Sequence, residues 1–130
     1  MGRSQIAETL FVKLIYGKAE AISAGTKISG PEQPIGDLLP QIQEVLDVMK
    51  EEGADISSNI RKRLTEKMVE DSDKIVAIIE DSEILPDYLE KSNKLIRWNV
   101  SDPKGKDIVF TRQVKNQIKD LVINFIKTLS

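Results

Sequence analysis

Ile75-Val76-Ala77-Ile78-Ile79 is an uninterrupted apolar run with a charged residue at each end. A strand that is buried on both faces of a parallel sheet has this composition, because helices cover both sides of such a sheet. The run therefore predicts an α/β fold built around a mostly parallel sheet, and the segments on either side of it should alternate between helices and strands.

The segments after the run fit this alternation. They predict a short helix near Pro86–Lys91, a strand over Lys94–Val100 and a long helix over Asp107–Leu129. In the strand, Trp98 is interpreted as a packing residue rather than a substrate contact. The long helix has an apolar stripe at helical spacing, Phe110, Val114, Ile118, Leu121, Phe125 and Leu129, broadened by Val122 and Ile126.

The chain begins with an amphipathic helix, predicted over Ser4–Ile15. Ser4 is its expected N-cap, and Gly17 is its expected C-terminal stop. Two adjacent apolar rows run along the helix: Ile6, Leu10 and Leu14 form one, and Ala7, Phe11 and Ile15 form the other.

Four elements are predicted between this helix and the apolar run. They are a strand over Ala19–Ala24, a loop rich in proline and glycine over residues 27–40, a helix over Pro40–Glu52 and a short helix over Thr65–Ser72. The whole order predicts one domain over residues 1–130 with a three-layer α/β/α architecture. An α/β unit normally begins with a strand, but this sequence begins at the helix, so the leading strand is expected to be missing.

Composition narrows the possible chemistry. The chain has 130 residues, a net charge of −2, no cysteine and no histidine. It therefore lacks disulfides, thiolate nucleophiles, Cys/His zinc sites and histidine acid–base catalysis, and we expect no cofactor and no bound metal. The near-neutral charge does not favour nucleic acid or an anionic membrane as partner. No apolar run approaches the ~20 residues of a membrane span, so a cytoplasmic location is expected.

Five short motifs follow one another along nearly the whole chain. They are Gly2-Arg3-Ser4-Gln5-Ile6-Ala7-Glu8, Ser23-Ala24-Gly25-Thr26, the segment from Val48 to Ser57, Asp73-Lys74-Ile75-Val76, and the segment from Trp98 to Pro103. Together they resemble the low-molecular-weight protein tyrosine phosphatase and thioredoxin-coupled arsenate reductase family. The resemblance implies a phosphotyrosine protein phosphatase I-like fold whose first strand is missing here.

The family resemblance assigns roles to three residues. In the family, a phosphate loop C-x-x-N-x-G-R-S binds the oxyanion with backbone N–H groups at a helix N-terminus, and a thiolate attacks the bound group. Arg3 matches the arginine of this loop, Ser4 the hydroxyl that supports the thiolate, and Asp102 the general acid. Met1 stands at the variable position of the loop, so the cysteine and asparagine would precede residue 1.

Each of these residues also has a simpler interpretation. Arg3 and Ser4 can be a chain terminus with a helix cap, and Asp102 can serve the Asp-Pro-Lys-Gly turn. The cluster of Glu80, Asp81 and Glu83 is interpreted as a solvated strand end rather than a metal site.

The branch of the family stays open. Phosphatases of this family often carry an aromatic residue after the Asp-Pro pair, where this chain has Lys104. The reductases pass oxidation to further cysteines, whereas this chain has Glu80 and Asp81 where such a relay would begin.

In the family the first strand lies in the centre of the sheet. Its loss would leave about 10 Å between its neighbours, because adjacent strands are ~4.8 Å apart. Three responses are possible: the flanking strands pair directly, a partner chain supplies a strand, or the domain is partly molten. We expect direct closure or a homodimer formed through exposed strand edges.

Two function hypotheses follow. In the first, the chain is an incomplete enzyme of phosphomonoester hydrolysis or arsenate reduction, with the cysteine loop encoded upstream of Met1. In the second, it is a non-catalytic relative that acts as an interaction or anion-binding module for phosphate, arsenate or another oxyanion. Under either hypothesis the chain as given is expected to lack phosphatase activity. An unrelated serine or metal hydrolase has no supporting constellation of residues.

Overall fold

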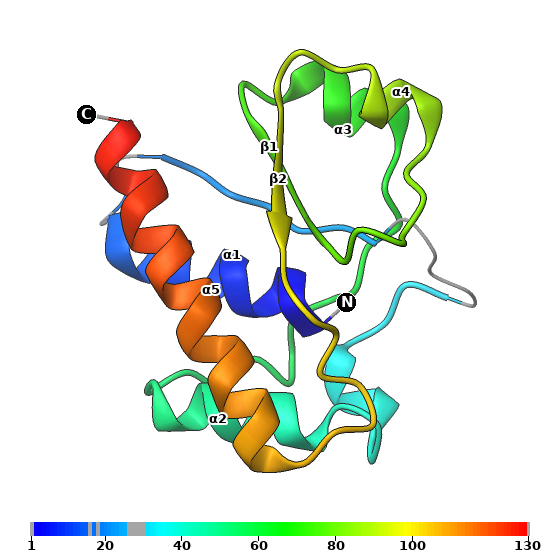
Figure 1. Cartoon of the computed structure of the whole chain (residues 1–130). Helices are drawn as coiled ribbons and strands as arrows, with labels where there is room; N and C mark the ends of the chain where they lie inside the picture. Colours follow the sequence, from blue (N-terminus) through cyan, green and yellow to red (C-terminus); the bar gives the residue numbers. More distant parts are fainter. Residues whose placement is uncertain (1, 16, 18, 26–30, 130) are drawn as a thin grey trace.

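The structure, a computed structural model, describes residues 2–15, 17, 19–25 and 31–129 (Figure 1). Its sheet is formed by β1 (Ile75–Ile79) and β2 (Leu95–Asn99), which pair in parallel with Ile75 opposite Leu95 and Ile79 opposite Asn99. The helices are α1 (Gly2–Ile15), the 3-10 helix η1 (Ile35–Leu38), α2 (Gln43–Glu51), α3 (Glu66–Asp71), α4 (Asp87–Glu90) and α5 (Ile108–Thr128). The predicted α/β fold with a parallel sheet is therefore confirmed.

The sheet separates two apolar clusters, as the composition of the run 75–79 predicts. Val76 and Ile78 pack against the larger cluster, whereas Ala77 belongs to the smaller one. Since alternate residues of a strand point to opposite faces, β1 is covered on both sides.

Helices form the layers on either side of the sheet. α5 crosses α1 and α2 on one side, while α3 and α4 lie on the other (Figure 1). The larger cluster is centred on fully buried residues of α1, α2 and α5, which are Ile6, Leu10, Met49, Ile118 and Val122. Trp98 of β2 and Val100, just after β2, also belong to it. The packing role predicted for Trp98 is confirmed, because its side chain is buried and its ring meets Phe125 edge-on, with centroids 6.0 Å apart.

The helix ends confirm some predicted signals and correct one. α1 ends at Ile15, and Gly17 follows with a φ of 77°, as expected for a glycine that ends a helix. α1 begins at Gly2, so Ser4 lies inside the helix and the prediction that it is the N-cap is wrong. The cap of α5 is Asp107, whose side chain accepts a hydrogen bond from the Phe110 N–H.

The strand predicted over residues 19–24 is absent from the described part of the chain. Ile22 is 58% exposed, and Gly25 forms only an isolated bridge with Arg63. A short segment of small residues becomes a strand only when a neighbouring strand pairs with it, and the described part of β1 pairs with β2 alone. The expected direct closure of the sheet therefore does not occur among the described residues, where β1 pairs with β2 alone.

The region between α1 and α2 also differs from the prediction. Residues 26–30 of the predicted loop lie outside the described residues. Within the remainder of that loop, η1 forms a single turn. α2 begins at Gln43, so Pro40 precedes the helix and does not occupy its first turn.

Candidate functional site

The candidate site lies at the carboxyl ends of the two strands. Glu80 directly follows β1, and Val100 to Asp102 directly follow β2. Because parallel strands end at the same edge of a sheet, these segments are neighbours, and such edges are where α/β folds bind ligands. Arg3, in the first turn of α1, extends its side chain to this edge.

The Arg3 guanidinium connects α1 to both strand ends. Its Nη1 donates to the Val100 carbonyl at 2.7 Å, and its Nη2 lies 2.9 Å from Glu83 Oε1 and 3.9 Å from Asp102 Oδ2. Only 8% of the Arg3 side chain is exposed. The structure thus brings Arg3 and Asp102 together. The family resemblance gives Arg3 the contact with the oxyanion and Asp102 the role of general acid.

Asp102 sits at the rim in a tight turn. Its Oδ1 accepts a hydrogen bond from the Lys104 N–H at 2.9 Å, and its own N–H donates to Glu80 Oε1 at 2.9 Å. Asp102 therefore serves the turn and also faces Arg3, so its two interpretations are compatible. With 47% of its side chain exposed, its carboxyl group is accessible to a ligand.

Glu83 is the carboxylate closest to Arg3, and its charge is stabilised there. Partial burial raises the pKa of the Glu83 carboxyl, but hydrogen bonds from the Glu80 N–H and from Arg3, together with the charge of Arg3, hold that pKa below its usual value. At neutral pH Glu83 is therefore ionised, and it neutralises Arg3.

Ser4 lies at a neighbouring surface. It is half-buried and lines a shallow depression with Gln5, Ser23, Gly25 and Arg61. Of the three residues singled out by sequence, the structure brings together Arg3 and Asp102, and it places Ser4 at a neighbouring surface.

Sequence reasoning missed the roles of Glu80 and Glu83. Both are interpreted from the sequence as a solvated strand end. In the structure, Glu80 accepts a hydrogen bond from the Asp102 N–H, and Glu83 forms an ion pair with Arg3. The signal that points to them is their position in the loop that follows a buried parallel strand, at the edge where ligands bind. Within the described ranges, no three or more Asp and Glu side chains converge as they would to hold a metal ion.

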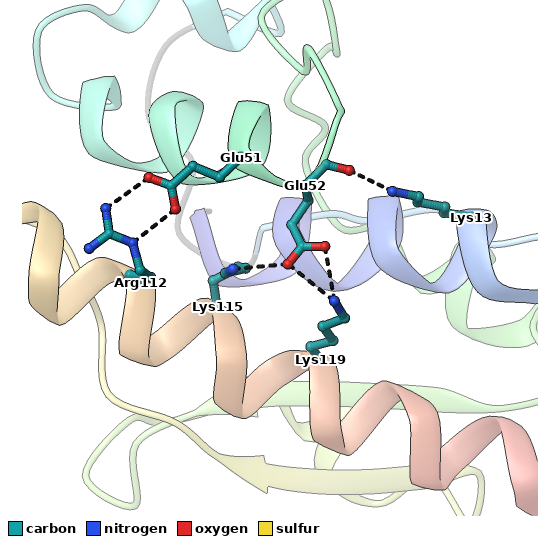
Figure 2. Close-up of polar contacts among 6 residues, drawn as sticks. All are labelled: Lys13, Glu51, Glu52, Arg112, Lys115 and Lys119. Carbon is teal, nitrogen blue, oxygen red and sulfur yellow. Dashed lines mark hydrogen bonds and ion pairs between the residues drawn. The ribbon is translucent and has the colours of Figure 1, made fainter.

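A second polar cluster, between α2 and α5, is structural (Figure 2). Glu52 accepts hydrogen bonds from Lys115 at 2.9 Å and from Lys119 at 3.1 Å, and Glu51 forms a bidentate pair with Arg112. The Lys115 and Glu52 side chains are only 8% and 14% exposed. This ion-pair cluster fixes the end of α2 against α5, and it lies on helices away from the strand ends.

Glu52→Gln is expected to lower the free energy of unfolding at pH 7 by about 1–3 kcal/mol, because it leaves a buried lysine without its carboxylate. Hydrogen bonds from Lys115 and Lys119 lower the pKa of Glu52, with burial opposing them. A carboxyl with a lowered pKa in the folded state stabilises the fold above its unfolded pKa of ~4.3, and this contribution disappears at lower pH. The difference between the two proteins should therefore shrink below about pH 4.

Urea unfolding followed by circular dichroism at several pH values measures this effect. Glu51→Gln is the matched control. The side chains of Glu51 and Arg112 are each 41% exposed, so the loss of this pair should lower the free energy of unfolding less. Equal losses in both variants would contradict the assignment of Glu52 as the buried partner.

Among the described residues, no helix is both long and apolar enough to cross a membrane.

Comparison with known proteins places these features in a family. The sequence profile described as "Low molecular weight phosphotyrosine protein phosphatase" matches residues 1–130. A curated relative, "Arsenate reductase 2" of Staphylococcus epidermidis, is 26% identical over 123 residues, which cover 95% of this chain and 86% of the relative.

Solved structures agree with this result. The low molecular weight protein tyrosine phosphatase from T. tengcongensis aligns with a TM-score of 0.77 at 26% identity, covering 97% of this chain and 90% of that one. "An arsenate reductase in the phosphate binding state" aligns with a TM-score of 0.78 at 26% identity, covering 98% of this chain and 90% of the other. Relatives on both sides of the phosphatase–reductase division therefore share this fold.

Proposed function

Because this chain belongs to the low molecular weight phosphotyrosine protein phosphatase family, we propose that it binds phosphate-like oxyanions at the edge formed by Arg3 and Asp102. The observation that carries this proposal is the convergence of Arg3 Nη2 and Asp102 Oδ2 to 3.9 Å, although the residues lie almost at opposite ends of the sequence. The phosphate-bound state of the similar arsenate reductase supports an oxyanion as ligand.

The two residues have complementary roles in this proposal. A guanidinium donates hydrogen bonds to the oxygens of a phosphate or arsenate group and stabilises charge on them. Asp102 takes the role of general acid, which gives a proton to a leaving oxygen. The role that the resemblance gives Ser4, support of a thiolate, has no thiol to act on in a chain without cysteine.

We propose that the family's reaction, phosphomonoester hydrolysis or arsenate reduction, is not completed by this chain alone. Both reactions in the family begin at a cysteine thiolate, and no cysteine or histidine is present to attack phosphorus or to activate another nucleophile. The described residues supply the arginine and the acid of such a site without the nucleophile.

The expected result in an aryl phosphate assay is release of the aryl alcohol at the rate of buffer alone. Arg3→Met should show the same background rate, since there is no enzymatic turnover to lose. Hydrolysis above background that Arg3→Met abolishes would contradict the proposal, because it would require a nucleophile within this chain.

A second candidate function is supported by the sheet. β1 is covered on both faces, and among the described residues its only partner strand is β2, which pairs along one of its edges. We propose that a second copy of the chain pairs through the other edge of β1 and that the protein acts as an interaction module.

Light scattering across a range of concentrations tests this dimer. The mass should rise above the monomer value of 14.6 kDa as concentration increases, and the β1 amides should become protected from hydrogen exchange in step. A constant monomer mass with fully protected β1 amides would exclude the interaction module.

A further inference from the structure

The contact between Glu83 and Arg3 has the form of a ligand contact. The Glu83 carboxylate lies 2.9 Å from Arg3 Nη2, closer than the 3.9 Å that separates Nη2 from Asp102. A carboxylate and a phosphate oxygen pair with a guanidinium in the same way. We propose that Glu83 is a built-in competitor that occupies the oxyanion position on Arg3 and must leave before an oxyanion binds.

Little of the Arg3 side chain is open to an oxyanion. The Arg3 side chain is 8% exposed, and its Nη1 is held by the Val100 carbonyl at 2.7 Å. Nη2 is the nitrogen directed toward the acidic rim, where Glu83 already lies. A ligand that binds Arg3 at Nη2 therefore replaces the Glu83 carboxylate and does not add to it.

Glu83 can leave by rotation of its side chain. Its side chain is 30% exposed, and its neighbour Ile84 is 79% exposed, so solvent reaches this part of the loop. Leu85 is buried and anchors the loop to the smaller apolar cluster, so the backbone can stay in place. The part-buried hydrogen bond from the Glu80 N–H to Glu83 Oε1 would also break, and a water molecule would have to replace that acceptor.

The charges around Arg3 make the competition strong. Glu80 and Asp102 add two further carboxyl groups at the same edge, while Arg3 is the cation in direct contact with Glu83 and Asp102. A ligand with two negative charges is repelled by this group of carboxylates. We therefore expect weak binding of phosphate by the unmodified chain and tighter binding once the charge of Glu83 is removed.

The inference rests on the proposed oxyanion site, and the experiment separates the two. Inorganic phosphate is titrated at pH 7 and constant ionic strength into the full chain and into Glu83→Gln, with binding followed by NMR chemical shifts. Glu83→Gln should bind phosphate roughly three- to tenfold more tightly. Glu90→Gln is the matched control, since Glu90 pairs with Arg97 at an exposed site, and it should leave the affinity unchanged.

Three results overturn the inference in different ways. If phosphate binds the unmodified chain through Arg3 but Glu83→Gln gives no gain, the competitor role is wrong and the proposed function stands. An equal gain in Glu90→Gln would mean that overall charge alone controls affinity. If neither protein shows binding that Arg3→Met abolishes, the proposed function fails and the competitor role fails with it.

Glu83→Gln is expected to fold like the unmodified chain. The glutamine oxygen can still accept hydrogen bonds from Arg3 and from the Glu80 N–H, so Glu83→Gln should keep the native loop. Should it unfold, Glu83→Asp makes the same comparison, because its shorter side chain withdraws the carboxylate from Arg3 and should also tighten phosphate binding.

Discussion

Replacement of Trp98 by alanine is expected to lower the free energy of unfolding by about 3–5 kcal/mol, the range for a large aromatic removed from a core. Trp98 is 9% exposed and packs edge-on against Phe125, so its side chain joins β2 to α5 within the larger apolar cluster. The alanine would leave a cavity at the junction of sheet and helix layers, and it would remove the edge-to-face ring contact.

Urea unfolding followed by circular dichroism measures this loss. Tryptophan fluorescence cannot be used, because the substitution removes the only tryptophan of the chain. Trp98→Phe is the matched control and should be much less destabilising, because it keeps an aromatic ring against Phe125. Near-unchanged stability in Trp98→Ala together with weaker phosphate binding would contradict the packing role and indicate a ligand contact instead.

Replacement of Arg3 by methionine is expected to abolish phosphate binding and to lower the free energy of unfolding by about 2–4 kcal/mol. The methionine keeps an apolar stem but leaves the Val100 carbonyl without its donor and Glu83 without its cation. The lower end of this range applies if Glu83, which is 30% exposed, turns into solvent.

Arg97→Met is the matched control for the loss of one arginine. The Arg97–Glu90 pair spans 3.3 Å with both side chains about half exposed, so its loss should have little effect on stability. Comparable losses in the two variants would show that Arg3 does not clamp the first turn of α1 to the strand ends. Phosphate affinity that survives Arg3→Met would show that the oxyanion binds elsewhere.

The strongly patterned elements could be predicted from sequence. The apolar run of β1 and the long apolar stripe of α5 carry their own signals, and the observed bounds Ile75–Ile79 and Ile108–Thr128 agree with the prediction closely. The predicted strand at residues 19–24 failed because a strand needs a partner, and pairing is a property of the whole sheet. Its small and apolar residues held no information about whether that partner would be adjacent.

The candidate site also contains residues that could be identified from the sequence and contacts that could not. Arg3 and Asp102 were singled out only through the family resemblance, and the structure then placed them near each other. The pairing of Glu83 with Arg3, and of Glu52 with Lys115, joins residues far apart in sequence, and no local pattern specifies such pairs. They depend on loop geometry and helix packing, which become visible only in the folded chain.

The central claim is that an oxyanion binds at the edge formed by Arg3 and Asp102. It is tested most directly by titrating inorganic phosphate into the isotope-labelled chain and mapping which NMR resonances move. We predict saturable shifts at the Arg3 side chain and at the backbone amides of residues 80–83, 100–102 and 104, with the α2–α5 cluster of Figure 2 unaffected. Shifts confined to the depression lined by Ser4 and Arg61, or no saturable shifts at all, would contradict it.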